Sequence, residues 1–453
     1  MNFTEKARYF AIATLALGLL WILGSIAYAQ GNGWETERAK KLGVKLLASL
    51  DSSGPDAWDP KAHPTVFVTT EGPGYGGLLS GVKTPGFVII DAKSRKVVTS
   101  RTYDVFKEFG WKDVFEPHGL AVSADGKWIY LPTGDGATKG RLLIINARTL
   151  KIDKVLGLMN RPHHGKTFTT PDGKSLTYVY GWEQPVFVMD PAQDNKVVGG
   201  LDFNEMGMEG YLYFVNHRGD TMLASGRFRP GGAREIVHDN VVIQIDTKSW
   251  KMIDYMAIGD STPVWVAFST DDKFAYVSGG HSSQVFKYDL TAKGLHALKP
   301  VAHSRAGVEG PYGIHFGWDD NFLWTVGKGE GSHNRGRVLG LVSAKLMEKT
   351  TRPMDQFTTN CIRGDHGTLH PDPEVNQLWI SCNSSFEVVV FDLDEKKVVD
   401  RIPTPNGGST HSGAFVRYDG WKGQVLSDQN GLHGSALAAK RKMLGLPQAQ
   451  KGR

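Results

Sequence analysis

One phrase occurs seven times along the sequence, and this repeat constrains the fold more than any other feature. Each copy has a polar or small opener, an apolar run, an Asp/Gly-rich turn and a second apolar run, as in PHGLAVSADGKWIYLPTG from Pro117. Successive openers lie 45 to 54 residues apart, and a third run with alternating apolar residues follows most copies. A repeat of this length, built from short strands, predicts the four-stranded blade of a β-propeller.

The two ends of the repeat region predict how the ring closes. Residues 65–103 supply strands but lack the opening phrase, whereas the last copy, from His411, has an opener and little after it. Joined, the two ends make one blade, and their pairing removes exposed sheet edges. We therefore expect an all-β fold, a seven-bladed β-propeller over residues 61–433 closed by pairing of N- and C-terminal strands. An eight-bladed or open arrangement is the alternative. The 54 glycines and 21 prolines agree with a turn-rich β fold.

The N-terminus has the pattern of an export signal. Lys6 and Arg8 precede an apolar run from Phe10 to Ile26, and Ala27-Tyr28-Ala29 fits the A-x-A cleavage pattern. We predict a signal peptide over residues 1–29 and a periplasmic protein. Since the apolar run is nearly long enough to span a bilayer, an uncleaved membrane anchor is the competing interpretation. The only two cysteines, Cys361 and Cys382, can then form one disulfide in an oxidising compartment, and the sequence leaves open whether they do.

The segments flanking the repeat have simpler patterns. Residues 30–60, which include GWETERAKKLGVKLLASL, are typical of an amphipathic helix and a linker. Residues 434–453 form a basic tail with a short helix candidate, which we expect to be a solvated end of the chain. The formal net charge of +5 is spread thinly outside this tail, so nothing indicates a nucleic-acid partner.

Histidines gather at the openers of the repeat. In a propeller, the innermost strand of each blade meets the central channel near its opener, so equivalent residues of successive openers surround one small volume. Histidine makes up only 15 of 453 residues, yet four openers carry one or two, a fifth carries Glu209 and a sixth has a histidine three residues on. The histidines in question are His118, His163, His164, His315, His366 and His411.

Such a cluster indicates a metal site. A lone histidine at a strand start is usually a structural residue, but several unpaired imidazoles confined together gain little unless something binds them. Neutral imidazole suits copper, zinc, iron and nickel, and affinity at a nitrogen site rises toward copper. More histidines than one ion needs suggest two or more ions. His163 and His164 can serve two different ions, because successive side chains of a strand point to opposite faces.

With its HH pair, Glu-Gly opener and late histidine openers, the chain resembles exported seven-bladed propellers with polynuclear copper sites. These are the copper thiocyanate dehydrogenases and, less closely, nitrous oxide reductase. The resemblance covers about residues 60–433 and implies that the six opener histidines are copper ligands. The sequence has no C-terminal cupredoxin-like segment or clustered cysteines, and its HH lacks the following x-H, which argues against nitrous oxide reduction.

The resemblance further implies a copper-dependent oxidoreductase acting on a small sulfur- or nitrogen-containing anion such as thiocyanate. A copper-bound water would be the nucleophile and Glu209 the general base. Lys83, Arg227, Arg229 and Arg305 are candidates for binding the anion, and Asp239 for orienting a ligand histidine. An exported electron acceptor such as a cytochrome c is the expected protein partner.

A different class remains open from the sequence. Many exported propellers are binding platforms without chemistry, and the blade segment YVSGGHSSQVFKYDL is of this generic type. The channel histidines would then hold a metal or a haem-type cofactor, or serve a protein partner, without catalysis. Metal content and the absorption spectrum of the purified protein separate these alternatives.

Overall fold

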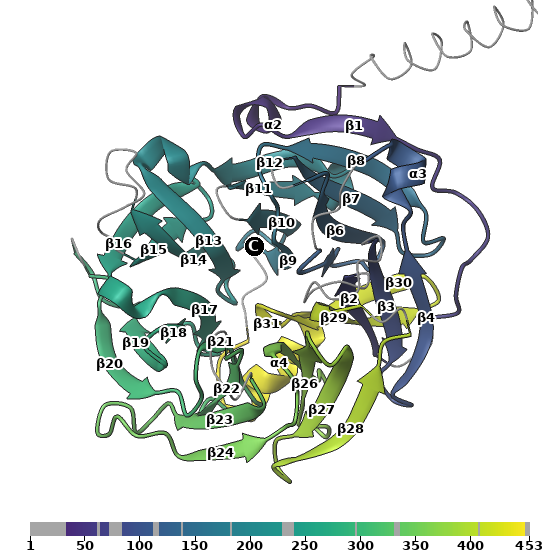
Figure 1. Ribbon diagram of the computed structural model, residues 1–453. Helices are drawn as coiled ribbons and strands as arrows, with labels where there is room; N and C mark the ends of the chain where they lie inside the picture. The colour runs from purple at the N-terminus through teal and green to yellow at the C-terminus, as the bar shows by residue number, and fades with distance from the viewer. Residues whose placement is uncertain are drawn as a thin grey trace, which may run out of the picture.

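The structure is a computed structural model, and it describes residues 33–60, 64–71, 84–111, 117–136, 139–181, 184–228, 240–294, 297–329, 336–405 and 408–448. Seven antiparallel sheets surround one axis, as Figure 1 shows, with β9, β13, β17 and β21 near the centre and β16, β20, β24 and β28 at the rim. The prediction of an all-β, seven-bladed propeller is therefore confirmed. The predicted signal peptide, residues 1–29, lies outside the described residues; within them, no helix is long and apolar enough to cross a membrane.

The first three blades follow one another along the chain. Blade 1 contains β5 (Ala121–Val122), β6 (Trp128–Gly134), β7 (Gly140–Asn146) and β8 (Ile152–Leu158). Blade 2 contains β9 (His164–Thr169), β10 (Ser175–Gly181), β11 (Gln184–Asp190) and β12 (Lys196–Leu201). Blade 3 contains β13 (Met208–Val215), β14 (Thr221–Phe228), β15 (Asn240–Asp246) and β16 (Lys251–Ala257). Each blade runs outward from its first strand, as the repeat predicts.

Blades 4 to 6 have the same four-stranded order. Blade 4 contains β17 (Pro263–Phe268), β18 (Phe274–Gly279), β19 (Gln284–Asp289) and β20 (Pro300–Arg305). Blade 5 contains β21 (Pro311–Phe316), β22 (Phe322–Gly327), β23 (Val338–Ser343) and β24 (Asp355–Thr358). Blade 6 contains β25 (Gly364–Leu369), β26 (Gln377–Cys382), β27 (Glu387–Asp392) and β28 (Lys397–Pro403). Short elements connect blades: α3 (Val105–Phe109), η2 (Phe203–Met206) and η3 (Gly259–Ser261). Within blade 2, η1 (Pro191–Gln193) joins β11 to β12.

Blade 7 joins the two ends of the chain. Its inner strand β29 (Thr410–Asp419) pairs antiparallel with β2 (Thr65–Glu71), placing Phe67 opposite Ala414. The strands β3 (Pro85–Asp91) and β4 (Lys96–Thr102) complete the blade toward the rim. This is the closure that the sequence predicts. β30 (Lys422–Asp428) and β31 (Gly431–Leu432) extend the same sheet on the other side of β29.

The segment before the ring differs from the expected amphipathic helix. Only α2 (Glu37–Lys41) is helical, and the chain then leaves the helix at Gly43, which has a φ of 64°, a left-handed conformation that suits glycine. The following strand, β1 (Lys45–Ser49), pairs with β8 and gives blade 1 a fifth strand. Trp34 is buried and its indole donates to the carbonyl of Asp194 in blade 2. Residues 45–49 therefore pair with the outer edge of blade 1 instead of continuing the helix that their sequence pattern predicts.

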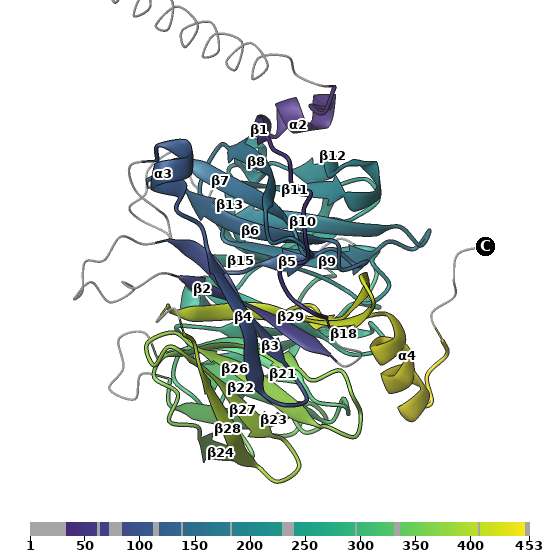
Figure 2. The same cartoon turned by 90° about the vertical axis from the view of Figure 1, so that its right-hand side faces the viewer.

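The basic tail is a packed helix rather than a solvated end. α4 (Gly434–Met443) lies on one face of the disc, at the right of Figure 2. Lys440 is buried and its Nζ donates to the carbonyl of Gly317 and pairs with Asp320, at 2.8 Å each. Arg441 donates to the carbonyl of Thr270. The helix therefore binds blades 4 and 5 together by satisfying groups at their turns.

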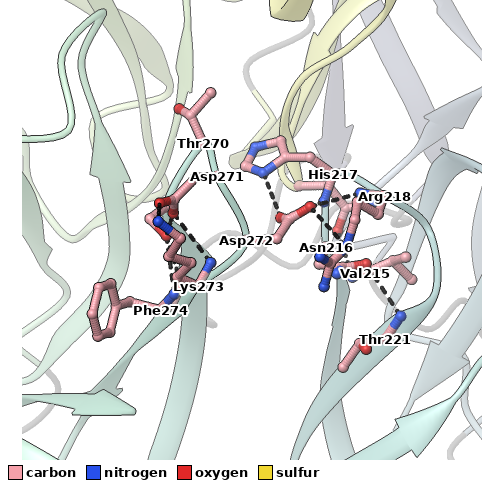
Figure 3. Close-up of polar contacts among 12 residues, drawn as sticks. Val215, Asn216, His217, Arg218, Thr221, Thr270, Asp271, Asp272, Lys273 and Phe274 are labelled. Carbon is pink, nitrogen blue, oxygen red and sulfur yellow. Dashed lines mark hydrogen bonds and ion pairs between the residues drawn. The ribbon is translucent and has the colours of Figure 1, made fainter. Parts of the chain in front are cut away.

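The turns after the inner strands of blades 3, 4 and 5 also connect neighbouring blades. In Figure 3, the Asp272 carboxylate of blade 4 accepts hydrogen bonds from the backbone amides of His217 and Arg218 in blade 3. The His217 ring lies against the same carboxylate, with Nδ1 2.9 Å from Oδ1. In the next turn, Asp320 accepts from the backbone amide and the hydroxyl of Thr270. These contacts fix the angle between blades, and so the positions of residues around the axis.

A disulfide joins Cys361 and Cys382, which decides a pairing that the sequence leaves open. It links the connection that leads into β25 to the end of β26, where Cys382 lies opposite Gly364 in the ladder. Both cysteines are buried within an apolar cluster between blades 5, 6 and 7. The disulfide therefore anchors the chain just before Asp365 and His366.

Candidate functional site

Five of the seven inner strands carry the same β-bulge near their first residues. In each bulge, two residues of the inner strand lie opposite a single residue of the neighbouring strand. In β25, for example, Asp365 and His366 lie between Gly364 and Gly367, which pair with Cys382 and Ile380. The bulges fall at Tyr211–Leu212, Val264–Trp265, Tyr312–Gly313, Asp365–His366 and His411–Ser412. Bulges re-aim side chains locally. Two adjacent residues of each inner strand thus reach the channel region.

The other two blades meet the same register. Gly119 forms parallel bridges with both His164 and Ser412, so it is level with His164 of blade 2 and with the second bulge position of blade 7. We call the first bulge position and its equivalents the first ring: His118, His163, Tyr211, Val264, Tyr312, Asp365 and His411. The second ring is Gly119, His164, Leu212, Trp265, Gly313, His366 and Ser412.

Side chains of the first ring contact their neighbours around the axis. The His118 ring centroid lies 4.1 Å from that of His163 and 4.3 Å from that of His411. Nδ1 of His411 is 2.6 Å from Oδ2 of Asp365. On the other side, the His163 ring lies 5.2 Å from the Tyr211 ring. Three imidazoles and a carboxylate therefore occupy four consecutive blades: 6, 7, 1 and 2.

The second ring adds two imidazoles to this cluster. The centroids of His164 and His366 are 5.0 Å apart, and those of His163 and His164 are 4.4 Å apart. Glycine at position 119 makes room for them, since a Cβ there would lie 2.0 Å from Nδ1 of His164. We call His118, His163, His164, His366 and His411 the imidazole cluster. It contains five of the six predicted ligands and unites distant parts of the sequence.

His163 and His164 enter the cluster together. Strict strand alternation predicts opposite directions for their side chains, but both rings lie within it. His163 precedes β9, which begins at His164, so the pair occupies the point where the chain enters the sheet rather than the regular strand. The expected separation of this pair onto opposite faces is therefore wrong.

Several ring nitrogens of the cluster are buried with no hydrogen-bond partner among the described residues. They are Nδ1 of His163 and both ring nitrogens of His164 and of His366. A buried polar atom without a partner costs about 1–3 kcal/mol, so such atoms call for an explanation. Burial and neighbouring positive charges lower the pKa of His163, His164 and His366 well below the usual value. These rings are therefore neutral at pH 7, the form that binds metal ions.

Asp365 connects the cluster to a buried lysine. Its Oδ2 lies 2.6 Å from Nδ1 of His411 and 3.2 Å from Nδ1 of His366, and its Oδ1 lies 3.1 Å from Nζ of Lys328. Burial disfavours the carboxylate, but His366, Lys328 and His411 outweigh burial and hold the pKa of Asp365 well below its usual range. Asp365, His366 and His411 also place ligand atoms within 4.8 Å of one another. The sequence interpretation did not identify Asp365 or Lys328.

His315, the sixth predicted ligand, lies apart from the imidazole cluster. Because the bulge of β21 falls at Tyr312 and Gly313, His315 is two residues further into the strand than the second ring. Its Nε2 accepts a hydrogen bond from the backbone amide of Gly367 at 2.9 Å, and its ring packs 5.5 Å from Trp265. Burial lowers the pKa of His315 to about 3. This histidine is neutral and hydrogen-bonded in the structure.

The predicted catalytic residues have different placements. Glu209 stands at the start of β13, opposite Arg227, with its side chain 11% exposed and its Oε1 3.9 Å from Arg227. It precedes the first ring by two residues. Arg305 lies at the end of β20, a rim strand, and therefore not at the channel. Lys83, Asp239 and Arg229 lie outside the described residues.

The chemistry of the donor set fits transition-metal ions. Neutral imidazoles with unpartnered nitrogens, a buried carboxylate and mutual distances of a few ångströms match the ligands of copper and zinc sites. Asp365 bonds to Nδ1 of His411, as carboxylates commonly do with metal-ligating histidines, and Nε2 of that ring lies 3.4 Å from Nδ2 of Asn383. The residues present thus fit a metal centre.

The fold and this cluster define the protein as a seven-bladed β-propeller with a histidine-lined channel. No protein-family model and no curated protein matches the sequence. Solved structures match it at the level of the fold. The dihydro-haem d1 dehydrogenase NirN is 13% identical, with a TM-score of 0.50 over 85% of this chain and 75% of NirN.

Two further structures have shorter chains that the alignment covers almost completely. The periplasmic gluconolactonase PpgL of Pseudomonas aeruginosa is 15% identical, with a TM-score of 0.55 over 77% of this chain and 99% of PpgL. A putative 6-phosphogluconolactonase from Bacteroides uniformis is 13% identical, with a TM-score of 0.54 over 79% and 100%. At these identities the likeness concerns the propeller fold, and the chemistry must be argued from the site.

Proposed function

We propose that this protein is an exported, copper-dependent oxidoreductase that acts on a small sulfur- or nitrogen-containing anion such as thiocyanate. The observation that carries the proposal is the imidazole cluster with its buried, unpartnered ring nitrogens. Five imidazoles exceed the needs of a single ion, so we propose two or more copper ions. The proposed ligands are the five cluster histidines, and His315 is left out because its Nε2 already accepts a hydrogen bond.

Bound copper would polarise the substrate, acidify a water molecule and accept electrons. The chain's own residues would set up that chemistry. Asp365 orients His411 through Nδ1 and lies 3.2 Å from Nδ1 of His366 without a hydrogen bond to it, and Lys328 balances the carboxylate charge. Glu209, partly exposed two residues ahead of the first ring, is the proposed general base. Lys83 and Asp239 keep their proposed roles in anion binding and in orienting a ligand histidine.

Export and an electron-accepting partner belong to the same proposal. The N-terminal pattern, the disulfide and the word periplasmic in the name of PpgL all support export to the periplasm. Oxidation of the substrate releases electrons that must leave the protein, and an exported cytochrome c is the proposed acceptor. A membrane contact is proposed only for an uncleaved N-terminal segment.

A haem-type cofactor, which the name of NirN brings to mind, is a weaker candidate for this channel. Ring centroids 4.1 to 4.4 Å apart are already in contact, so no planar macrocycle fits between these imidazoles. Burying further imidazoles beside a haem would also leave their nitrogens without partners. A non-catalytic metal-binding propeller is distinguished from the enzyme by assay rather than by geometry.

The test measures metal content and turnover of the full-length chain exported in a bacterial host. We expect about two or three copper ions per chain and copper-dependent oxidation of thiocyanate with a cytochrome c or a dye as acceptor. His366→Ala combined with His411→Ala should remove most copper while the β-rich circular dichroism spectrum stays unchanged. His303→Ala, on the rim strand β20, is the matched control.

Each outcome decides one part of the proposal. Wild-type protein that binds no copper overturns it, and a haem absorption band replaces it with a tetrapyrrole-binding function. Full copper content in the double variant shows that the ligand assignment is wrong. Copper without turnover of any small anion leaves a metal-binding propeller and removes the enzyme.

A further inference from the structure

The first ring has a second half that the metal proposal does not use. Blades 3, 4 and 5 place Tyr211, Val264 and Tyr312 at the positions where blades 6, 7, 1 and 2 place Asp365 and three histidines. The two tyrosines sit on opposite sides of Val264 in this order. We call Tyr211 and Tyr312 the tyrosine pair.

The hydroxyl groups of the tyrosine pair meet across blade 4. A hydrogen bond joins the two phenol oxygens, so the side chains span the gap that the short Val264 leaves. Tyr211 also packs 5.2 Å from the ring of His163, and Tyr312 packs 5.1 Å from the ring of His366. The pair therefore forms the wall that faces the histidine half of the ring, in contact with the imidazole cluster at both ends.

A buried lysine, Lys328, lies beside the tyrosine pair. Nζ of Lys328 lies 3.9 Å from the centroid of the Tyr312 ring, while the same ammonium is 3.1 Å from Oδ1 of Asp365. Tyr312 and Lys328 are both buried, and Tyr211 is half-buried. Phenol hydroxyls beside a buried cation suit the recognition of an anion.

We infer that the tyrosine pair is the substrate-recognition element of this site, binding the end of a small linear anion that points away from the imidazole cluster. The inference rests on the proposed function, since the cluster must hold copper for one end of the anion to be fixed there. Recognition by hydroxyl groups would favour anions with a terminal nitrogen or oxygen acceptor over halides of similar size. Tyr211 and Tyr312 are thus substrate-binding residues rather than ligands.

The test compares copper-loaded wild type with Tyr211→Phe, Tyr312→Phe and the double variant. Phenylalanine keeps the ring contacts and removes only the hydroxyl groups. Binding of thiocyanate, azide and chloride is measured by calorimetry and by titration of the copper absorption bands. We expect the double variant to keep its copper content, while its Kd for thiocyanate and azide rises about 10- to 100-fold and that for chloride stays nearly unchanged.

A control variant and separate readouts keep the outcomes apart. Tyr103→Phe removes a buried hydroxyl that donates to the carbonyl of Leu150, far from the channel, and should change no anion affinity. An unchanged Kd for thiocyanate in the double variant overturns the inference, as does a lower melting temperature with unchanged affinity, which marks a purely structural brace. Loss of copper in the double variant overturns the substrate role as well. Wild type without copper overturns the proposed function and, with it, this inference.

Discussion

Asp365 is hydrogen-bonded to His411, with Oδ2 2.6 Å from Nδ1, although 46 residues separate them in the chain. The same carboxylate pairs with Lys328 through its other oxygen. One buried group thus orients a proposed ligand and compensates a buried cation. The first prediction separates these two roles.

Asp365→Asn should weaken both metal binding and folding. Losing the carboxylate that orients His411 is expected to reduce copper affinity about 10- to 100-fold. Leaving Lys328 buried without a charge partner should cost roughly 3–5 kcal/mol of unfolding free energy. Combining Asp365→Asn with Lys328→Met should recover stability but not copper affinity. Denaturant melts and copper titrations measure the two effects, and recovery of both in the double variant would refute the orienting role.

Gly119→Ala should empty part of the metal site without unfolding the protein. The added Cβ would lie 2.0 Å from Nδ1 of His164 and 2.6 Å from Oγ of Ser412, so the His164 ring must turn away. We expect loss of at least one copper ion per chain, measured by elemental analysis. Gly317→Ala, whose Cβ would meet the flexible Leu393 side chain at 3.2 Å, should keep the full content. Equal metal content in both variants would exclude His164 as a ligand.

Removing the disulfide with Cys361→Ser and Cys382→Ser should destabilise the protein by about 3 kcal/mol, the chain-entropy expectation for a loop of this size. The two cysteines are 21 residues apart. Copper retention should fall as well, because the disulfide anchors the chain just before Asp365 and His366. Melting temperature and metal content are compared with and without reductant. A variant that melts like the wild type would contradict the stabilising role.

Acidification should destabilise the metal-free protein below about pH 6.5. Burial lowers the pKa of His370 to about 4, whereas an unfolded chain binds that proton near pH 6.5. Between these values the unfolded state holds more protons, so stability is complete above pH 6.5 and falls as pH decreases. By pH 4, the lowered pKa of His370 alone should reduce the free energy of unfolding by about 3 kcal/mol.

The matched variants for this effect are His370→Gln and His281→Gln. Replacing buried His370 should reduce the proton uptake on unfolding by about one between pH 6.5 and 4, as read from the pH dependence of denaturant melts. His281→Gln replaces an exposed histidine and is the control for the substitution itself. A pH dependence of His370→Gln equal to that of the wild type would contradict neutral burial of this ring.

The sequence pattern alone determined the architecture of this protein and most of the imidazole cluster. A repeat of four short strands cannot bury its apolar faces without neighbours, so seven openers and two incomplete ends already specify a closed ring. Because equivalent positions of a ring face one axis, five of the six predicted histidines meet there. The triplets HHG, DHG and HSG, at His163, Asp365 and His411, are the sequence signal that places Asp365 in register with the histidines.

Only the tertiary structure decided which other residues lie beside the imidazole cluster. A bulge turns two adjacent residues of an inner strand toward the channel, which strict alternation does not predict, and it brings in Asp365, Tyr211 and Tyr312. The same bulge leaves His315 deeper in its strand, where the amide of Gly367 binds it. Lys328 reaches Asp365 from a neighbouring blade. Bulges and contacts between blades depend on backbone pairing across sheets, which the order of residues along one strand does not encode.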